Sequence, residues 1–317
     1  MDFLSLLSMP GTEIEEMAGQ MARERFGYTV YLRGLIEISN YCRCNCYYCG
    51  IRRGNKKIVR YRLSYDEILD TCRVGVELGF HTVVLQGGED PYWRGKHLVE
   101  LVSQIHQNHP NITITLSLGE MNRDEYQALY DAGARRYLLR HETIDSNHFQ
   151  QLHPKEQTIE QRVEALCALK SVGFETGAGG MVGSPGQTLL HLAKDLCFIQ
   201  ELQPEMIGIG PFIPHQDTPF HQYPSGGLEL TLRMVALCRL ICPNANIPAT
   251  TAVASSAVDG RRRALEAGAN VVMPNLSPPK YRDFYSLYNN KARTGSEAAE
   301  GLSLLRAELL QYGYTTL

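Results

Sequence analysis

Four cysteines lie within eight residues of this chain, in the segment IEISNYCRCNCYYCGIRRGN. Three of them, Cys42, Cys46 and Cys49, have the spacing C-x₃-C-x₂-C. Thiolates are soft ligands that suit an iron–sulfur cluster or a zinc ion. A structural zinc site usually needs four ligands in two paired groups, and the sequence has no evident second pair of Cys or His. The spacing therefore favours a [4Fe-4S] cluster with one iron left open, and a non-catalytic iron–sulfur or zinc binding protein is the alternative.

The other cysteines need separate interpretations. Cys44 is surplus to the three-cysteine pattern, so it is either a redundant thiol or a residue with a ligand-exchange or redox role. The remaining five are scattered through apolar helical patterns and are expected to be small buried hydrophobic residues: Cys72, Cys167, Cys197, Cys238 and Cys242.

A second candidate motif, QGGED, occupies Gln86 to Asp90 directly after an apolar strand-like run. Gly87 and Gly88 let the backbone approach a ligand closely, and Glu89 can accept a hydrogen bond from an ammonium group. A Gly-Gly turn after a strand is also common without a ligand, so both interpretations stay open.

Charged residues end a later strand-like run, YLLRHET. Alternation along a strand places Leu138, Arg140 and Glu142 on one side, and Leu139 and His141 on the other. At the mouth of a barrel, the inward Arg and Glu are either a mutual ion pair or ligand groups, because buried charges need partners.

Two further features lie beyond this run. Arg162, in the next helical pattern, either binds a carboxylate through two N–H donors of its guanidinium or is a solvated charge on the helix.

The segment GAGGMVGSPGQT, Gly177 to Thr188, lacks the spacing of a dinucleotide fingerprint and the Gly-Lys-Ser/Thr of a phosphate loop. Its glycines are therefore expected to make room for a ligand at the barrel mouth.

The elements that must position these motifs alternate between short apolar runs and longer helical periods. The predicted strands are Leu35–Ser39, Thr82–Gln86, Ile112–Leu116, Arg136–Arg140, Phe174–Ala178, Met206–Gly210, Ile247–Thr251 and Val271–Met273. The predicted helices are Glu13–Phe26, Ser64–Leu78, Lys96–Asn108, Arg123–Ala132, Ile159–Val172, Leu189–Leu202, Leu230–Ile241, Gly260–Ala267 and Glu297–Leu310. Ser64 with Glu67 three residues later is a capping-box pattern at the start of one of them.

Strict alternation without a hairpin signal favours a parallel sheet, and eight units suit an α/β fold of the (β/α)₈ TIM-barrel type. A doubly wound open sheet is the alternative. We expect a single domain over residues 1–317, with a barrel core at about 35–275 and short N-terminal helical and C-terminal extensions. In a barrel the βα loops meet at one face, which would bring the cysteine segment and the second motif together.

The composition narrows the partners and the compartment. The 31 basic and 34 acidic residues give a net charge of −3, which argues against nucleic acid or an anionic membrane as a partner. There is no run of about 18 apolar residues that could span a membrane. The start, MDFLSLLSMPGTEIEE, lacks the basic region of a signal peptide. We therefore expect a cytoplasmic protein.

The cysteine spacing on the first loop of a predicted barrel resembles the radical S-adenosylmethionine (SAM) superfamily. Longer strings resemble the [FeFe]-hydrogenase maturase HydE family, with the biotin synthase and methylornithine synthase families as neighbours. RHET, GIGPFIPH and IPATT are specific within the superfamily. The strings span residues about 35 to 290: SNYCRCNCYYCGIRRGN, QGGEDPYW, TLSLGE, RYLLRHET, ETGAGGMVGSPGQT, GIGPFIPHQDTP, NIPATTA and GANVVMPN.

The resemblance implies an enclosed barrel cavity that holds a [4Fe-4S] cluster and SAM. The reduced cluster would donate an electron to SAM, giving methionine and a 5′-deoxyadenosyl radical. In the HydE family this radical acts on the sulfur of an iron-bound cysteine complex that carries carbon monoxide and cyanide. An electron donor such as ferredoxin or flavodoxin and other hydrogenase maturases are the implied partners.

The resemblance also implies roles for matching residues. The cluster ligands would be Cys42, Cys46 and Cys49. The cofactor-binding set would be Tyr48, Gln86, Gly87, Gly88, Glu89, Ser117, Glu142 and Arg162. The substrate-binding set would be Arg140, Met206, Thr250, Thr251, Met273, Tyr281 and Tyr285, with Arg140 and Tyr281 as catalytic residues. Packing is an equal interpretation for Tyr48 and for the two threonines.

The chain departs from the family pattern in two places. Some members carry three C-terminal cysteines for an accessory cluster, but here the region reads NNKARTGSEAAEGLSLLRAELL, so we expect one cluster only. Gly87 stands where close relatives often have Ser, which would loosen one contact. The leading alternative function is that of a related radical SAM enzyme that acts on a small amino-acid-like substrate, as a mutase or methylornithine synthase does.

Overall fold

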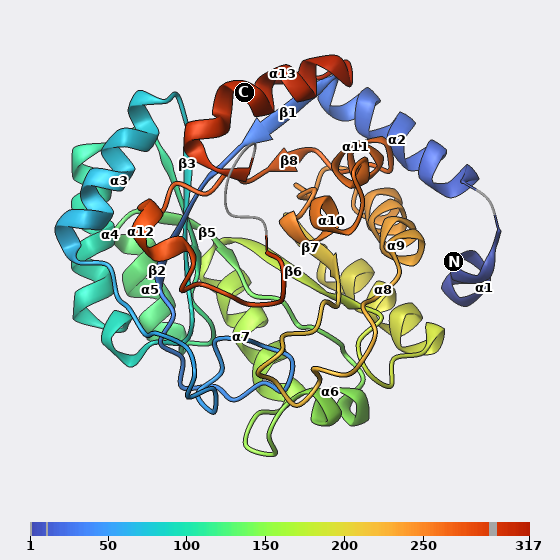
Figure 1. The fold of residues 1–317 in the computed structure, drawn as a ribbon, viewed down its shortest axis with the longest axis horizontal. Helices are drawn as coiled ribbons and strands as arrows, with labels where there is room; N and C mark the ends of the chain where they lie inside the picture. The colour runs from blue at the N-terminus through green and yellow to red at the C-terminus, as the bar shows by residue number, and fades with distance from the viewer. Residues whose placement is uncertain (1, 11, 292–296) are drawn as a thin grey trace.

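The computed structural model describes residues 2–10, 12–291 and 297–317. A parallel sheet forms the centre of the molecule, and helices surround it (Figure 1). Six strands are hydrogen-bonded to one another in chain order: β2 (Gly34–Ser39), β3 (Thr82–Gly87), β4 (Thr113–Ser117), β5 (Ala134–Leu138), β6 (Glu175–Val182) and β7 (Met206–Pro211). All five neighbouring pairs are parallel.

Short segments after β7 close this sheet into a ring. A parallel bridge joins the start of β7 to Asn246, and another joins Pro248 to β8 (Val271–Val272). A third bridge joins Asn275 to Leu35 in β2. Counting the segment around Pro248, eight strand positions form the ring, which confirms the predicted (β/α)₈ architecture rather than an open sheet.

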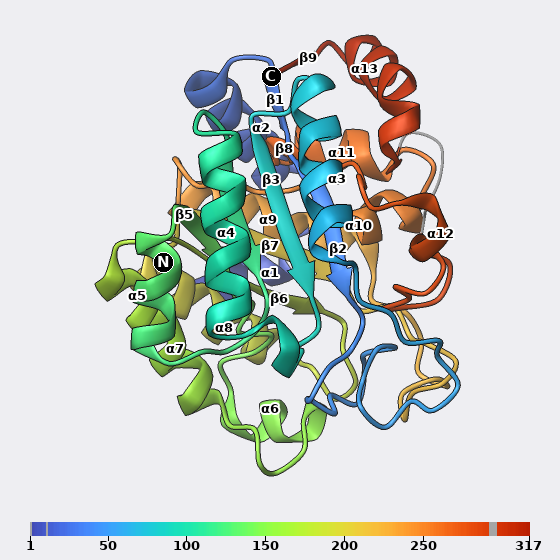
Figure 2. The ribbon, with the colours of Figure 1, turned by 90° about the vertical axis from the view of Figure 1, so that its left-hand side faces the viewer.

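Helices cover the outside of the ring (Figure 2). Those that alternate with the barrel strands are α3 (Tyr65–Glu77), α4 (Lys96–Asn108), α5 (Arg123–Asp131), α7 (Ile159–Val172), α8 (Leu189–Leu202), α9 (Leu228–Ile241) and α11 (Gly260–Glu266). Shorter helices lie in the connecting loops: α6 (Ser146–Leu152), α10 (Thr251–Ser256) and the 3₁₀ turn Pro91–Trp93. None of the helices in the described part of the chain is long and apolar enough to cross a membrane.

The extensions pack against the barrel at both ends of the chain. The N-terminal one comprises α1 (Phe3–Ser8), α2 (Glu13–Phe26) and β1 (Thr29–Leu32), and α2 packs along α9. The C-terminal one comprises α12 (Pro279–Arg282), the 3₁₀ turn Ala299–Gly301, α13 (Leu302–Gln311) and β9 (Thr315–Thr316). The strands β1, β8 and β9 pair in parallel, so both ends of the chain meet at the same edge.

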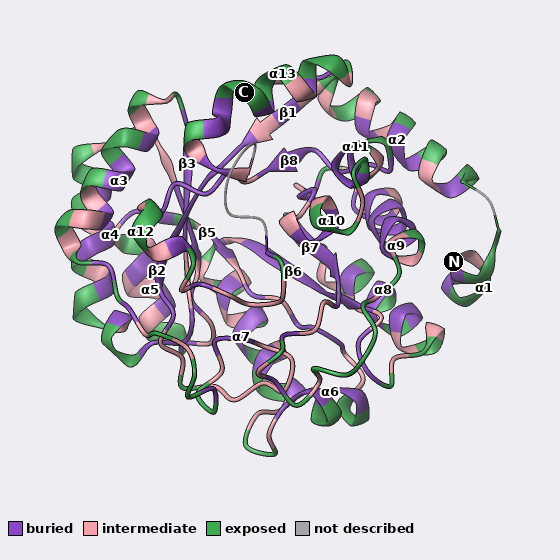
Figure 3. Ribbon diagram, viewed as in Figure 1, coloured by how far each residue is buried: buried purple, intermediate pink, exposed green. Residues whose placement is uncertain are grey.

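Local sequence signals explain where the helices begin and end. The Ser64 hydroxyl accepts a hydrogen bond from the backbone N–H of Glu67 at 3.2 Å, and the Glu67 carboxylate accepts one from the backbone N–H of Ser64 at 2.8 Å, which confirms the predicted capping box. Helix α7 ends at Gly173, whose φ of 103° only glycine adopts at little cost. The apolar faces of the helices and the strands are buried against one another (Figure 3).

Two sequence predictions about elements are wrong in part, and two short strands were missed. The strand predicted at Ile247–Thr251 is reduced to two bridges, because Thr250 caps helix α10 through its side chain and the helix begins at Thr251. The helix predicted from Glu297 begins only at Leu302, after a 3₁₀ turn. The strands β1 and β9 were not predicted, since short edge strands carry little periodic signal.

The glycine-rich segment after Phe174 also differs from expectation. Strand β6 continues through Val182, so the first glycines lie inside a strand rather than in a ligand loop. A Cβ atom on Gly179 would lie 2.1 Å from the Gly208 carbonyl oxygen, and one on Gly180 would lie 2.6 Å from that of Glu142. Gly179 and Gly180 therefore make room for neighbouring backbone. Whether the other glycines of the segment make room for a ligand stays a prediction.

Candidate active site

The loop that carries the cysteines leaves the carboxyl end of β2 and returns to it. An antiparallel bridge between Ser39 and Arg62 ties its two ends together. In Figure 2 this loop lies beyond the arrowheads of β2 and β3, on the same end of the barrel as α6. The cysteines therefore lie at the face where a parallel barrel places its catalytic loops, as predicted.

The three predicted cluster ligands are half-buried free thiols: Cys42, Cys46 and Cys49. Burial raises the pKa of Cys46 to about 12 and also raises that of Cys49, whereas a hydrogen bond between the Cys42 and Cys44 side chains lowers the pKa of Cys42. Buried thiols ionise only beside a compensating cation, so this donor set suits metal binding.

The same thiols do not converge on one point. In the described part of the chain, no three His, Cys, Asp or Glu side chains form a group that could hold a single metal ion. A four-iron cluster is held by one thiolate on each ligated iron, so it does not need three ligands around one ion. The donor set and its spacing thus fit a cluster better than a zinc ion.

The remaining cysteines are distributed differently from the prediction. Cys72, Cys238 and Cys242 are buried as expected, but Cys167 and Cys197 are exposed on the outer faces of α7 and α8. The helical patterns did not reveal which side of each helix these two residues occupy.

The second motif packs directly against the cysteine loop. A Cβ atom on Gly88 would lie 2.2 Å from the Tyr41 carbonyl oxygen and 2.7 Å from Cys42 Cβ. The Glu89 carboxylate accepts hydrogen bonds from Arg43 Nε at 2.8 Å and from the Glu120 backbone N–H at 3.2 Å. Gly88 is therefore explained by backbone approach, and Glu89 has partners within the chain.

Asp90 is the last residue of this motif, and the sequence predicted no role for it. Its carboxylate accepts a hydrogen bond from Ser39 Oγ at 2.6 Å and two from the Arg62 guanidinium, at 2.6 and 2.9 Å. Asp90 therefore fastens the end of the cysteine loop to the first two barrel strands.

The inward pair at the end of β5 lies as the alternation predicted. Arg140 Nη2 donates to Glu142 Oε2 at 2.9 Å, and Arg140 Nε is buried without a partner among the described residues. Glu142 has a φ of 67°, which is uncommon for a residue other than glycine and is typical of functional sites. His141 points the other way and is buried next to Asp195 and Phe198.

Arg162 is buried rather than solvated, so the alternative of a surface charge on its helix is wrong. Its guanidinium donates to the Glu120 carboxylate and to the Arg140 carbonyl oxygen. Burial acts to lower the pKa of Arg162, but Glu120 raises it overall, so the charge is retained. Glu120 was missed as a site residue, although it lies in the string TLSLGE.

The other predicted cofactor residues lie close to these groups. Ser117 ends β4 and pairs in register with Gln86 of β3. Tyr48 packs on His153 with ring centres 5.4 Å apart, and its hydroxyl lies 3.2 Å from His153 Nε2. Since His153 Nδ1 lies 2.9 Å from the Phe149 carbonyl oxygen, Nδ1 carries the proton and Nε2 accepts from Tyr48.

The predicted substrate residues fall into separate places. Tyr285 is buried, and its hydroxyl accepts a hydrogen bond from Gln86 Nε2 at 3.4 Å, which joins it to the second motif. Met206 begins β7, and its sulfur accepts a hydrogen bond from Arg33 at 3.2 Å at the opposite end of the strands. Met273 is half-buried directly after β8.

Three further substrate predictions have partners in the chain itself. Thr250 caps α10, and Thr251 Oγ1 donates to Glu297 Oε2 at 3.0 Å. The Tyr281 hydroxyl donates to Glu67 Oε1 at 3.0 Å, and its ring stacks on Tyr61. Within the described part of the chain, none of these three hydroxyls is hydrogen-bonded to Arg140 or Glu142.

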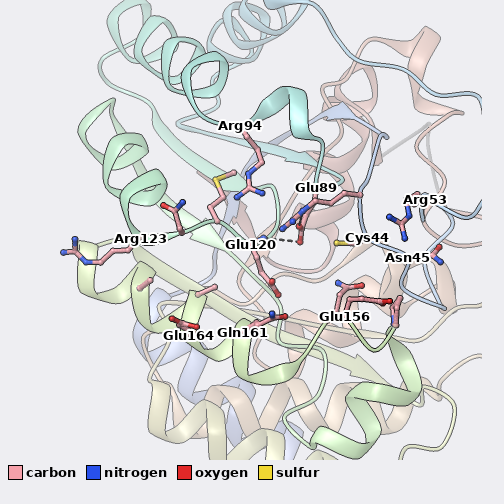
Figure 4. Close-up of a pocket in the computed structure, with 17 residues that line it drawn as sticks. Cys44, Asn45, Arg53, Glu89, Arg94, Glu120, Arg123, Glu156, Gln161 and Glu164 are labelled. Carbon is pink, nitrogen blue, oxygen red and sulfur yellow. Dashed lines mark hydrogen bonds and ion pairs between the residues drawn. The ribbon is translucent and has the colours of Figure 1, made fainter.

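A pocket of about 800 Å³ opens beside the cysteine loop (Figure 4). Figure 4 shows Cys44, Asn45 and Arg53 on one side of it and Arg123 and Glu164 on the other. Of the predicted site residues, Glu89 lines it, together with Glu120, the partner of Arg162. Cys44, the surplus cysteine, faces this pocket.

Comparisons with known proteins identify the family of the chain. The radical SAM superfamily profile matches residues 36–199. The [FeFe] hydrogenase maturase subunit HydE of Thermotoga maritima is 47% identical over 276 residues, which are 87% of this chain and 78% of that protein. A 3-methylornithine synthase of Methanosarcina acetivorans is 31% identical over 277 residues, 86% of this chain and 77% of that protein.

Solved structures give the same picture of the fold. The crystal structure of methylornithine synthase (PylB) matches with a TM-score of 0.85 and 26% identity, over 100% of this chain and 93% of that one. Radical SAM enzymes use a [4Fe-4S] cluster and SAM, which are also the cofactors of this chain. With a cysteine loop on the first turn of a parallel barrel and these relatives over most of its length, the chain belongs to the radical SAM superfamily and, within it, to the HydE family.

Proposed function

We propose that this enzyme acts in the maturation of the [FeFe]-hydrogenase active site, on an iron-bound cysteine complex. One observation carries the proposal: the cysteine loop, the second motif and the Arg162–Arg140–Glu142 chain of contacts lie at one end of the barrel, in a chain 47% identical to a HydE maturase. The small-molecule substrate would lie inside that end of the barrel.

Cys42, Cys46 and Cys49 would hold the cluster, since their thiols are the soft donors on the loop next to the barrel mouth. When bound and reduced, a [4Fe-4S] cluster supplies the electron that splits SAM into methionine and a 5′-deoxyadenosyl radical. The side chains of this protein would bind and orient SAM and keep water out.

Several residues would bind SAM around this loop. Arg162 has a planar fork that fits the carboxylate of methionine, and Glu89 and Glu142 offer acceptors for its ammonium. In the chain by itself these groups bind Glu120, Arg43 and Arg140. SAM binding would therefore exchange internal ion pairs for contacts to the cofactor.

Arg140 would face the substrate. Its Nε is a buried donor without a partner among the described residues, and such a donor is costly unless a ligand satisfies it. Carbon monoxide and cyanide ligands on iron present an anionic, acceptor-rich surface, which a guanidinium suits. Tyr285, held by Gln86, would lie on the wall of the same space.

Two partners are proposed for this function. One is an electron-carrier protein such as ferredoxin or flavodoxin, and the other is the maturase that supplies the iron complex. The cytoplasm is the proposed compartment, because it keeps thiols reduced and contains these donors. Neither partner is needed to explain the fold.

A second candidate is a carbon-skeleton rearrangement of an amino acid, which the likeness to 3-methylornithine synthases supports. Such a substrate needs a carboxylate for its ammonium group. The Glu142 carboxylate is already paired with Arg140, so it is not free to bind an ammonium group. This favours the anionic iron complex.

Two experiments test the proposal in sequence. The full chain, reconstituted anaerobically with iron and sulfide, is expected to release 5′-deoxyadenosine from SAM when dithionite is added; no release from a loaded cluster would refute every radical SAM function. Expression in a hydrogenase-producing strain without its own HydE is then expected to restore hydrogenase activity. No rescue by a chain that still cleaves SAM would favour the amino-acid substrate.

A further inference from the structure

Arg60 ties together the two sides of the cysteine loop. Its Nη1 donates to the carbonyl oxygen of Asn40, before the cysteines, and to that of Ile51, after them, at 2.7 Å. Its Nη2 donates to the carbonyl oxygens of Arg52 at 2.7 Å and Asn55 at 3.2 Å. One side chain thus joins backbone on both sides of the three predicted ligands, and we call these contacts the Arg60 clamp.

Two asparagines extend the clamp. Asn40 Nδ2 donates to the Val59 carbonyl oxygen at 2.8 Å, and its Oδ1 accepts from the Tyr61 backbone N–H at 2.8 Å. Asn55 Nδ2 donates to the Gly50 carbonyl oxygen at 2.7 Å. These contacts join the two ends of the loop through protein atoms.

An arginine is the side chain that can make this set of contacts. A guanidinium carries five N–H donors in a fixed plane and has no acceptor, so it can bind several carbonyl oxygens at once. Lysine has the charge but only a compact ammonium, and glutamine has a two-donor amide without charge. The identity of residue 60 therefore separates the geometry of the clamp from its charge.

The charge of Arg60 lies beside the backbone that flanks the cysteines. Its guanidinium is bound to the carbonyl oxygens of Asn40 and Ile51, which lie two residues before Cys42 and two residues after Cys49. An arginine stays charged at any ordinary pH. A fixed cation beside an iron–sulfur cluster stabilises the reduced state, which carries one more electron, and so raises the reduction potential.

We propose that Arg60 is a positioning residue with two effects: it holds the cysteine loop in its cluster-binding shape, and its charge raises the reduction potential of the cluster. The inference rests on the proposed function, since it needs a cluster on this loop. It adds a residue outside the three cysteines, the second motif and the barrel wall.

The test compares four full-length proteins after anaerobic reconstitution: wild type, Arg60→Lys, Arg60→Gln and Arg53→Gln. Arg53 is the matched control because it is an exposed arginine on the same loop, and its side chain makes no hydrogen bond to another residue within the described ranges. The midpoint potential is measured by redox titration followed by electron paramagnetic resonance. The rate of iron release to a chelator, bathophenanthroline, reports how firmly the loop holds the cluster.

Arg60→Gln is expected to have a more negative midpoint potential and to release iron roughly tenfold faster, because even one lost hydrogen bond changes an equilibrium by up to about that factor. Arg60→Lys is expected to keep the wild-type potential but to release iron faster. Arg53→Gln is expected to match the wild type in both readouts, since an exposed charge is screened.

Each readout can overturn its part of the proposal. Equal potentials in Arg60→Gln and the wild type would refute the effect of the charge, and equal iron release in Arg60→Lys and the wild type would refute the clamp. Circular dichroism shows whether Arg60→Gln folds. If it does not, the iron-release rates of Arg60→Lys and Arg53→Gln are compared to test the clamp. Arg60→Met then takes the place of Arg60→Gln in the measurement of the midpoint potential. A wild type that binds no cluster would instead refute the proposed function.

Discussion

Replacing Gly88 by alanine tests the approach of the second motif to the cysteine loop. The added Cβ would lie 2.2 Å from the Tyr41 carbonyl oxygen and 2.7 Å from Cys42 Cβ, whereas ordinary contacts begin at 3.4 Å. One obstacle is backbone and the other is the first carbon of a predicted cluster ligand. Neither atom can rotate away, so the two loops must separate by roughly 1 Å.

We expect this separation to lower the free energy of unfolding by about 1–3 kcal/mol, the usual range for an overpacked site. The hydrogen bond from the Gly88 backbone N–H to the Ser39 carbonyl oxygen, at 3.1 Å, would be stretched by the same movement. We expect the midpoint of thermal unfolding to fall by several degrees in Gly88→Ala. Because Cys42 itself is displaced, the iron content after reconstitution should fall as well.

Gly87→Ala is the matched control. A Cβ atom there would lie 3.1 Å from Leu118 Cδ2 and 3.3 Å from the Ser39 carbonyl oxygen, and the leucine end can give way. We expect a cost below about 1 kcal/mol and full iron content. Wild-type thermal stability and iron content in Gly88→Ala, measured by differential scanning calorimetry and iron analysis, would show that the close approach does not hold the cysteine loop in place.

Other substitutions test single groups of the site. Cys46→Ala is expected to lose the cluster absorbance and SAM cleavage together, whereas Cys44→Ala keeps both; loss of both in Cys44→Ala would mean that the ligand set is wrong. Burial lowers the pKa of His153 to about 3, so below about pH 6.5 the unfolded chain binds a proton that the folded chain does not. Stability should therefore fall as the pH drops from about 6.5 towards 3, by up to about 2 kcal/mol at pH 5. His153→Gln should remove this contribution in urea unfolding, and an unchanged pH slope would contradict the assignment. Arg162→Lys keeps the charge but loses the fork, and titration calorimetry of the reconstituted protein should show SAM affinity reduced roughly tenfold. Unchanged affinity would remove Arg162 from the SAM site.

Local patterns in the sequence predicted a large part of the fold. Helices α4, α7 and α8 begin and end at the predicted residues, because caps, glycines and prolines mark their ends within a few positions. The alternation around Arg140 also predicted its pairing with Glu142, since a two-residue period determines which side chains share a face.

Contacts between distant parts of the chain were not predictable in the same way. Arg60, Asp90 and Glu120 act through partners that lie far away in sequence or through backbone carbonyl oxygens. Neither kind of partner leaves a spacing pattern. Thr251 and Tyr281 show the converse, because the resemblance placed them on the cavity wall while the structure gives their hydroxyls partners in Glu297 and Glu67. Their role toward a substrate stays a prediction.

The way the barrel closes has a consequence for how a large substrate enters and leaves. Strands β6 and β7 are paired at six successive positions, whereas β7 meets the next segment of the ring at one bridge, next to Asn246. Pro248 meets β8, and Asn275 meets β2, at one bridge each as well. Local opening costs the free energy of the bonds that it breaks, so the ring opens most easily along this seam from β7 round to β2. The barrel is therefore expected to open along this seam, and amide hydrogen exchange should be faster at residues 246–249 than along β6. An iron complex wider than the mouth would enter by a brief parting of this seam, which borders β2, the strand that carries the cysteine loop.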